Sequence, residues 1–335
     1  MVFYSSYLNK YFLNDRSKIV LWVFNFSDRI LLKYYRMEKF TINDIFEFSE
    51  KNIISLALCS DNSSVACGLS DGILSVFNIS SNSIVFSKQI HQKSINSLFW
   101  STTNEIISAS EDSTIKVVDD ENGNVKAIYH GHDGPILSLA VSRTNYRIAS
   151  GGMDGIIKIW EPGNQTCLFS YMGNRPPIVS LQFTQNERFL LSLSADGLCT
   201  IYDLIKRIPI KSYQNLEKSL GLRVGSAQFS PNEKYILFSC LNSSLYLVDI
   251  DTAETVRKFK GHLNQFFCCI CGFLNGRQCY IIDENGILFI YDLQTASIIQ
   301  QFETQGKQRI PLVSSKSSIV IGGGPTNSTL KLICF

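Results

Sequence analysis

The sequence is poor in charged residues and almost neutral overall. Asp, Glu, Lys and Arg make up 18% of its 335 residues, against about 25% in ordinary soluble proteins, and the net charge is +2. This balance gives no overall attraction to nucleic acid or to an acidic substrate. No uninterrupted apolar run approaches the roughly 20 residues of a membrane-spanning helix. The low charge and the hydrophobic fraction of 45% favour a strand-rich protein with many buried positions.

Two further absences limit the chemistry. No glycine-rich loop leads from a strand into a helix, because Gly322–Pro325 joins two expected strands and lacks the lysine of a phosphate-binding loop. No signal peptide precedes the ten cysteines, so we expect reduced thiols in a soluble intracellular protein.

Residues 1–36 differ from the rest of the chain. They contain six basic residues against two acidic ones, interleaved with aromatic clusters and without helical or strand periodicity. One interpretation is a docking or targeting segment, and the other, which we favour, is an extension upstream of a start at Met37. We therefore expect a basic-aromatic extension over 1–36 that lies outside the fold, and one repeat domain over 37–335.

From Phe40 onward the sequence repeats with a period near 42 residues. Each unit has a polar turn residue six positions before a bulky strand residue, and successive turn residues are 41 to 46 positions apart. The seven pairs are Asp71/Phe77, Asp112/Val118, Asp154/Trp160, Asp196/Tyr202, Asn242/Val248, Asn285/Tyr291 and Asn327/Ile333. Seven such units predict an all-β, seven-bladed β-propeller of four-stranded blades around a central channel.

The unit over 224–262 shows how a blade is built and how the ring closes. Its apolar runs predict strands over 224–229, 235–240, 245–249 and 255–260, joined by tight turns. The seventh unit has no fourth strand of its own, whereas residues 39–48 form a strand that precedes the first unit. We expect this N-terminal strand to pair in the last blade, because that pairing removes an exposed edge.

One unit carries four polar residues at positions that can hydrogen-bond in series. They are His132 in the entering loop, Ser150 on the second strand, Asp154 in the next turn and Trp160 on the third strand. Ser, His and Asp together also suggest a catalytic triad. Parts of the set recur at the blade period, around His91 and His262, so we interpret the tetrad as structural and predict no catalytic residue.

Several metal-ligand residue types lie close together, namely His262, Cys268, Cys269, Cys271 and Cys279. A zinc site needs ligands that converge tetrahedrally, but residues three apart on a strand point to opposite faces, and no second Cys-x-x-Cys pair exists. We predict packed core thiols and no metal or other cofactor.

The Gly-His and Trp-Asp positions of these units resemble the WD-repeat (WD40) β-propeller family over residues 40–335. The pieces SPNEKYIL, KFKGHLNQFFC, IYDLQTASIIQ, ADGLCTIYD and SASEDSTIK resemble the WD-repeat subunit of COMPASS-type histone H3 lysine methyltransferase complexes. This subunit is WD-repeat protein five in animals and of the Swd-three type in fungi. The resemblance implies a rigid, non-catalytic scaffold with two binding surfaces.

The first implied surface is the mouth of the central channel, where the family holds a partner's arginine between two aromatic rings beside an acidic residue. The positions that match here are Asn96, Glu111, Leu137, Phe267, Cys268 and Ile270. Leu137 and Ile270 stand in place of the two rings, while Glu111 keeps the acid. We therefore expect weakened binding of arginine-containing peptides in the channel.

The second implied surface is a cleft between the fifth and sixth blades, where a partner lays an acidic-hydrophobic segment. The positions that match are Asn232, Tyr235, Leu247, Val256, Phe273 and Gln294. The first and third turns of a meander lie on one side, so Asn232, Tyr235 and Gln294 should reach the same face. The alternative is that SPNEK is only a good turn and Tyr235 a packing residue at an edge, and both interpretations stay open.

The expected function is a protein-interaction subunit of a COMPASS-like complex in the nucleus, with the cytoplasm as the alternative location. The expected partners are SET-domain methyltransferase complex subunits and the histone H3 tail, without direct contact to nucleic acid or membrane, and with one copy in a hetero-complex. The alternative is a WD-repeat scaffold of another assembly, such as the spliceosome or a ubiquitin ligase substrate receptor. An enzyme would need polar groups that converge in the channel.

Overall fold

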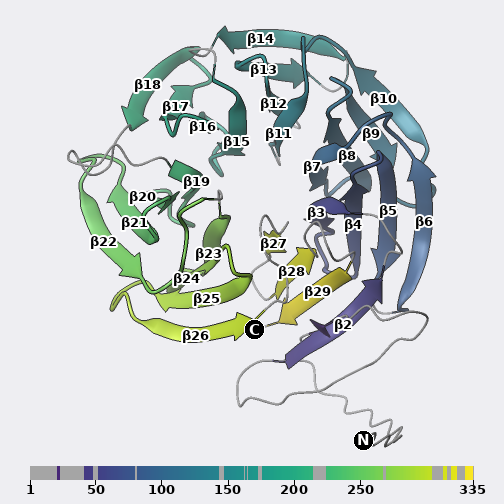
Figure 1. Ribbon diagram of the computed structural model, residues 1–335. Coiled ribbons are helices and arrows are strands. Elements are labelled where there is room, and N and C mark those ends of the chain that lie inside the picture. Colours follow the sequence, from purple (N-terminus) through teal and green to yellow (C-terminus); the bar gives the residue numbers. More distant parts are fainter. Residues whose placement is uncertain are drawn as a thin grey trace, which may run out of the picture.

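The computed structural model describes residues 21–22, 41–47, 52–79, 81–142, 147–161, 163, 165–172, 176–213, 224–266, 269–303, 312–314, 318–322 and 329–334. Their strands form sheets, antiparallel except for the pairing of the two N-terminal strands, that are arranged as blades around a central axis (Figure 1). In this described part no helix is long and apolar enough to cross a membrane. The predicted all-β propeller architecture is confirmed.

Six blades are four-stranded meanders whose strands run in chain order from the axis to the rim. The first has β3 (Ile53–Leu58), β4 (Ser64–Leu69), β5 (Ile73–Asn78) and β6 (Ser83–Gln89). The second has β7 (Ile95–Trp100), β8 (Glu105–Ser110), β9 (Ile115–Asp119) and β10 (Val125–Tyr129). The third has β11 (Ile136–Val141), β12 (Ile148–Gly152), β13 (Ile156–Glu161) and β14 (Thr166–Met172).

The next three blades repeat this plan. The fourth has β15 (Ile178–Phe183), β16 (Phe189–Ser194), β17 (Cys199–Asp203) and β18 (Ile208–Tyr213). The fifth has β19 (Val224–Phe229), β20 (Tyr235–Cys240), β21 (Ser244–Asp249) and β22 (Thr255–Lys260), so its predicted bounds are met except that β21 begins one residue earlier. The sixth has β23 (Cys271–Asn275), β24 (Gln278–Ile282), β25 (Ile287–Asp292) and β26 (Ile298–Glu303).

The seventh repeat does not form a seventh four-stranded blade, so the prediction of seven regular blades is wrong, and the regular blades number six. Instead it lies in a five-stranded sheet, here called the closing sheet, in the order β1-β2-β29-β28-β27. Its strands are β1 (Leu21–Trp22), β2 (Thr41–Glu47), β27 (Leu312–Ser314), β28 (Ser318–Gly322) and β29 (Thr329–Cys334). The closing sheet differs from a regular blade because β2 takes the place of a fourth strand of its own and β1 adds a fifth strand.

The predicted closure by an N-terminal strand is present. β2 pairs antiparallel with β29, from Thr41 opposite Cys334 to Glu47 opposite Thr329, and β27 and β28 lie against β3 of the first blade. Leu21–Trp22, which we expected outside the fold with the rest of 1–36, pair with β2 and β29. The other residues of 1–36 lie outside the described residues.

Residue type sets the backbone conformation of the second turn in each blade. One residue there has positive φ, and it is glycine in four blades and serine in two: Gly72, Ser113, Gly155, Gly197, Ser243 and Gly286. A Cβ atom on Gly72 would lie 2.2 Å from the carbonyl oxygen of His91. Glycine therefore lets this turn touch the loop that enters the next blade.

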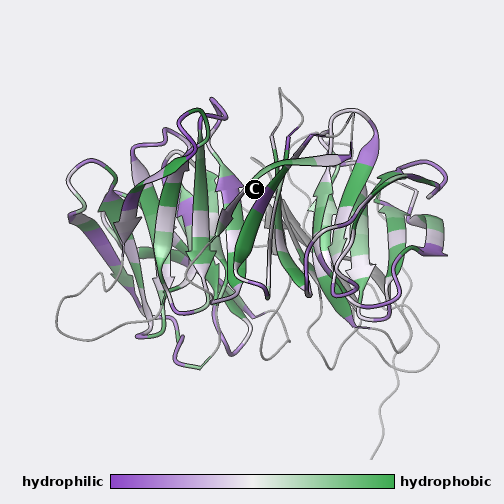
Figure 2. Cartoon of the chain, turned by 90° about the horizontal axis from the view of Figure 1, so that it is seen from above, coloured by the Kyte–Doolittle hydropathy of each residue, from purple (hydrophilic) through white to green (hydrophobic). Residues whose placement is uncertain are grey.

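The apolar core lies between neighbouring blades. One cluster, for example, joins Ile107 and Val117 of the second blade to Ile148 and Trp160 of the third. The rim strands are mostly exposed, as in β6, where only Phe86 is buried. Figure 2 shows the hydrophobic residues along the strands and much of the hydrophilic surface on the turns at both faces.

The innermost strands are tied to one another by side chains that bond to the backbone of the next blade. The bonds run from Ser55 Oγ to Ile95 O (2.7 Å), from Asn96 Nδ2 to Ile136 O (2.8 Å) and from Ser138 Oγ to Ile178 O (3.1 Å). The first and third turns of each blade open on one face of the ring, here called the first-turn face. The second turns and the entering loops open on the other, the second-turn face.

Candidate functional site

The four residues of the predicted tetrad meet in the third blade. His132 Nδ1 lies 2.7 Å from Asp154 Oδ2, and its Nε2 lies 2.7 Å from Ser150 Oγ. Trp160 Nε1 donates to the same hydroxyl oxygen at 2.8 Å. Because Ser150 Oγ accepts the indole N–H, its own proton points to His132 Nε2, and His132 Nδ1–H donates to Asp154.

This series has the connectivity of a catalytic triad but not its accessibility. The exposed fraction is 0% for Ser150 and 2% for Trp160, so a substrate cannot approach the hydroxyl group. Burial lowers the pKa of His132 more than the neighbouring Asp154 raises it, which keeps the imidazole neutral near pH 7. The network ties the entering loop to the second and third strands, as the structural interpretation predicts.

Partial copies of the tetrad occur in two other blades. In the second blade, His91 lies 2.9 Å from Asp112 and 2.8 Å from Ser108. In the sixth blade, His262 Nδ1 bonds the hydroxyl of Tyr291 at 2.9 Å, and its buried Nε2 has no hydrogen-bond partner among the described residues. Burial lowers the pKa of His262 to about 4. Repetition at equivalent positions of three blades supports an architectural role.

The predicted cysteine cluster is packed into the interface between the fifth and sixth blades. Cys269, Cys271 and Cys279 are buried there, while Cys268 lies outside the described residues. Burial raises the pKa of the Cys271 thiol to about 12, so this thiol is protonated at neutral pH. No group of three metal-ligand side chains in the described part of the chain could hold a metal ion.

The channel-mouth positions are only partly described, because Phe267 and Cys268 lie outside the described residues. Leu137 and Ile270 are half-buried, and Glu111 is exposed. Asn96 serves the fold, since its side chain donates to the Ile136 carbonyl and accepts from Ser94 Oγ at 3.1 Å. Glu111 is therefore the exposed charged group among these positions.

The structure brings three of the cleft positions into one apolar cluster between the fifth and sixth blades. Tyr235 and Phe273 are half-buried and pack against this cluster, which contains Leu247. Leu247 is only 6% exposed, so its predicted place on the docking surface is wrong. The third strand lies between two paired strands, and this side chain is covered by the sixth blade.

The other cleft positions lie at the exposed edge of the same two blades. Arg257 on β22 donates to the backbone carbonyls of Val256 at 2.8 Å and of Gln294 at 3.1 Å, which links the rim strand to the third turn of the sixth blade. Val256 is 37% exposed, and Gln294 is exposed. Asn232 is also exposed, but its side-chain Oδ1 accepts from Ser230 Oγ and from the Lys234 backbone N–H. Its observed contacts are thus those of a turn residue.

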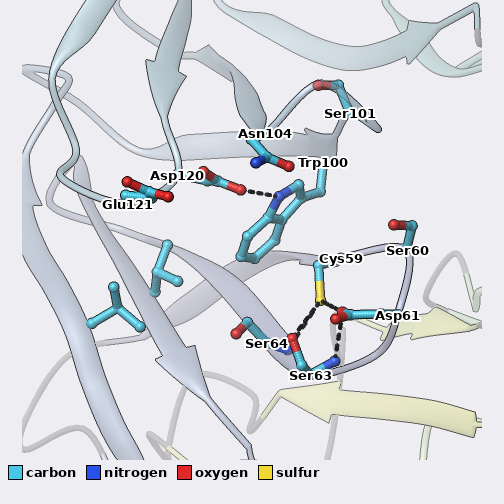
Figure 3. Close-up of a pocket in the computed structure, with 12 residues that line it drawn as sticks. Cys59, Ser60, Asp61, Ser63, Ser64, Trp100, Ser101, Asn104, Asp120 and Glu121 are labelled. Atoms are coloured by element: carbon cyan, nitrogen blue, oxygen red, sulfur yellow. Dashed lines mark hydrogen bonds between the residues drawn. The ribbon is translucent and has the colours of Figure 1, made fainter.

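A pocket that the sequence did not single out lies between the first and second blades on the first-turn face (Figure 3). Its volume is about 340 Å³, within the range of about 300–1,000 Å³ that is typical of small-ligand pockets. The residues that line it are Cys59, Ser60, Asp61, Ser63, Ser64, Val76, Val85, Trp100, Ser101, Asn104, Asp120 and Glu121.

Hydrogen bonds fix two carboxylates in this pocket. Trp100 Nε1 donates to Asp120 Oδ2 at 3.0 Å, and the Cys59 thiol donates to Asp61 Oδ1 at 2.7 Å (Figure 3). Burial raises the pKa of Cys59, and the bond from this thiol lowers the pKa of Asp61. The other oxygen of Asp120, Oδ1, is buried and accepts no hydrogen bond from the described residues.

Comparison with known proteins identifies three repeats. The family model for the WD domain, G-beta repeat (WD40), matches residues 82–119, 123–161 and 165–203. Each match begins at the rim strand of one blade and ends at the third strand of the next, as from β6 to β9. A repeat therefore links two neighbouring blades.

Two curated relatives match over 99 residues each. WD repeat domain-containing protein 83 of Rattus norvegicus is 29% identical over 28% of this chain and 30% of its own length. Angio-associated migratory cell protein of Canis lupus familiaris is 31% identical over 29% of this chain and 22% of its own length. The chain thus matches less than a third of either relative. These comparisons do not single out the COMPASS-type subunit, so that narrower resemblance stays a prediction.

Proposed function

We propose that this WD40 β-propeller is a non-catalytic scaffold subunit of a COMPASS-type histone H3 lysine methyltransferase complex in the nucleus. WD40 repeats typically mediate protein–protein interactions, which supports the general role. In the complex, the SET-domain subunit would carry out methyl transfer, and this chain would hold other subunits in place. The resemblance of the short sequence pieces supports the choice of this complex.

The observation that carries the proposal is a pair of half-buried aromatic side chains at the junction of the fifth and sixth blades, where the resemblance implies a cleft. Tyr235 and Phe273 are half-buried aromatic side chains against one apolar cluster. Val256 and Gln294 of the same two blades are exposed, on elements joined by Arg257. Half-buried aromatic rings with an exposed polar rim are the usual composition of an interaction hot spot.

The charge at this cleft fits an acidic partner. Lys234, in the first turn of the fifth blade, and Arg257, on its rim strand, are both exposed. A segment with acidic and apolar residues would place its carboxylates at these two cations and its apolar side chains against Val256 and Tyr235. This is the kind of segment that the resemblance implies for the cleft.

Affinity purification with mass spectrometry tests the assignment and the surface together. The wild-type chain should recover a SET-domain methyltransferase subunit, and Tyr235→Ala with Gln294→Ala should lower that recovery. The matched control, Phe189→Ala with Asp251→Ala, changes the equivalent positions one blade earlier in the chain. It should leave recovery unchanged. Equal recovery with both double variants would remove the cleft from the proposal.

The same purification separates the alternative assemblies. Recovery of spliceosomal or ubiquitin ligase proteins without a SET-domain subunit would favour the second candidate, a WD40 scaffold of another assembly. For the channel, titration with an arginine-containing histone H3 peptide should show weak binding, because Leu137 and Ile270 offer no ring for stacking. Submicromolar binding that is abolished by Glu111→Gln would contradict this expectation.

A further inference from the structure

The pocket between the first and second blades combines an indole ring with three carboxyl side chains, and no Lys or Arg lines it (Figure 3). We propose that this pocket binds an arginine side chain of a partner protein, placed between Trp100 and the carboxylates of Asp120 and Asp61. The site is separate from the cleft of the fifth and sixth blades. The proposal does not depend on the COMPASS-type assignment.

Asp120 is an exception to the repeat, as the backbone shows. In four blades the residue after the third strand is aliphatic and donates its backbone N–H to a first-turn carbonyl: Ile79 to Ser63, Leu204 to Arg188, Ile250 to Lys234 and Leu293 to Arg277. Asp120 makes the equivalent bond to Asn104 at 3.4 Å. The second blade therefore places a carboxylate where these four blades place an apolar side chain.

Trp100 is the matching exception on the first strand. It ends β7, whereas β15 and β19 end in Phe183 and Phe229. The corresponding pairs are thus Phe183/Leu204 in the fourth blade and Phe229/Ile250 in the fifth, without a polar group in either pair. An apolar pair is sufficient for a blade of this fold, so the fold itself does not require the Trp100–Asp120 pair.

Among the residues that the structure describes, no ion pair to the carboxylates of the pocket is present. Asp61 and Glu121 are exposed, and Asp120 Oδ1 has no donor among the described residues. The neighbouring lysines bond to other groups: Lys126 to Asp119 at 3.1 Å and to Glu105 at 3.4 Å, and Lys88 to Asn124 at 3.1 Å. A cationic ligand would supply the missing positive charge.

The combination of an indole ring and carboxylates favours a guanidinium group over an ammonium group as the ligand. A guanidinium is flat, so its face can stack on the half-buried indole of Trp100 while its edge donates two hydrogen bonds to one carboxylate. A small rotation of the Asp120 carboxyl group would give Oδ1 one of these donors. The lysine ammonium is a compact point charge that cannot combine both contacts in this way.

Fluorescence anisotropy with a short labelled peptide tests the proposal on the full chain. The probe is fluorescein-Gly-Ser-Arg-Ser-Gly-amide, and the matched peptides carry citrulline, which has the same shape without charge, or lysine in place of arginine. We expect the arginine peptide to bind at least tenfold more tightly than the citrulline peptide. Its binding should weaken as salt is raised. Equal affinity for the lysine peptide would overturn the assignment to arginine.

The decisive variant gives the second blade the residues of the fourth. Trp100→Phe with Asp120→Leu should unfold at the same temperature as the wild type, because the fourth blade accommodates the same apolar pair at Phe183 and Leu204. Its affinity for the arginine peptide should be at least tenfold lower. The control Phe189→Ala with Asp251→Ala, which lies outside both proposed binding surfaces, should bind as the wild type does.

A third variant covers the case in which the double variant fails to fold. Asp61→Asn changes an exposed turn residue and should lower affinity about tenfold in a folded protein. Wild-type affinity in either folded variant, or no binding of the arginine peptide to the wild-type chain at millimolar concentration, would overturn the proposal.

Discussion

The buried imidazole of His262 should make the stability of the propeller depend on pH. The residue is 4% exposed and bonds Tyr291 through Nδ1, while Nε2 has no partner among the described residues. Burial lowers its pKa from 6.5 to about 4. The proposed perturbation is His262→Gln, which keeps a polar side chain but removes the titrating group.

The direction of this pH dependence follows from the protons bound by the folded and the unfolded chain. Between pH 6.5 and pH 4 the unfolded chain binds a proton at this position and the folded chain does not, so folding loses stability as the pH falls through this window. Above pH 6.5 both states are neutral and the contribution is complete. For a folded pKa of about 4, the loss between pH 7.5 and pH 5 is about 2 kcal/mol.

Urea denaturation at pH 7.5, 6 and 5 measures this difference. The wild-type chain should lose about 2 kcal/mol more of its unfolding free energy across the range than His262→Gln does. His132, whose pKa is also lowered by burial, is present in both proteins and cancels in the comparison. Asp283, whose pKa is raised by burial, is likewise present in both proteins, so its titration also cancels. Equal losses in the two proteins would refute the reasoning.

Two further changes probe the fold. Ser150→Ala should cost about 2 to 4 kcal/mol of unfolding free energy, because it leaves the buried nitrogens of His132 and Trp160 without their shared partner. Ser297→Ala, at an exposed turn, serves as the control. A loss below about 1 kcal/mol in Ser150→Ala would contradict the network. Ser113→Gly should raise the unfolding free energy by about 0.5 kcal/mol, because φ is 69° there and glycine occupies this turn position in four other blades. A decrease measured by the same denaturation would contradict that account.

The repeat and its polar network could be predicted because their signals are local. Turn residues such as Asp154 and the bulky residue six positions later recur at a fixed period, and hydrogen bonding in the series follows from strand pairing. The strand predicted over 39–48 was expected to close the ring because it had no unit of its own. The pairing of Leu21–Trp22 in the closing sheet has no such signal, since a dipeptide shows no periodicity.

The sequence repeat could predict neither how deeply a given side chain is buried nor the presence of the pocket. Strand alternation indicates the side to which Leu247 points, but the packing of the sixth blade decides that it is covered. Trp100 ends the first strand of its blade and Asp120 follows the third. Both lie outside the repeat positions used to define the units. The available signal was their departure from the apolar pair at equivalent positions, and that equivalence rests on the backbone bond to Asn104.

The pairing of β2 with β29 has a consequence for how the chain folds as it is synthesised. β2 leaves the ribosome before the six regular blades, and β29 leaves it after them. At about 5–20 residues per second, the interval between them is roughly 15 to 60 s. During that time the blades form an open arc, and β2 presents an unpaired strand edge to other nascent chains. A chaperone that covers this edge would be needed only until the final strand arrives.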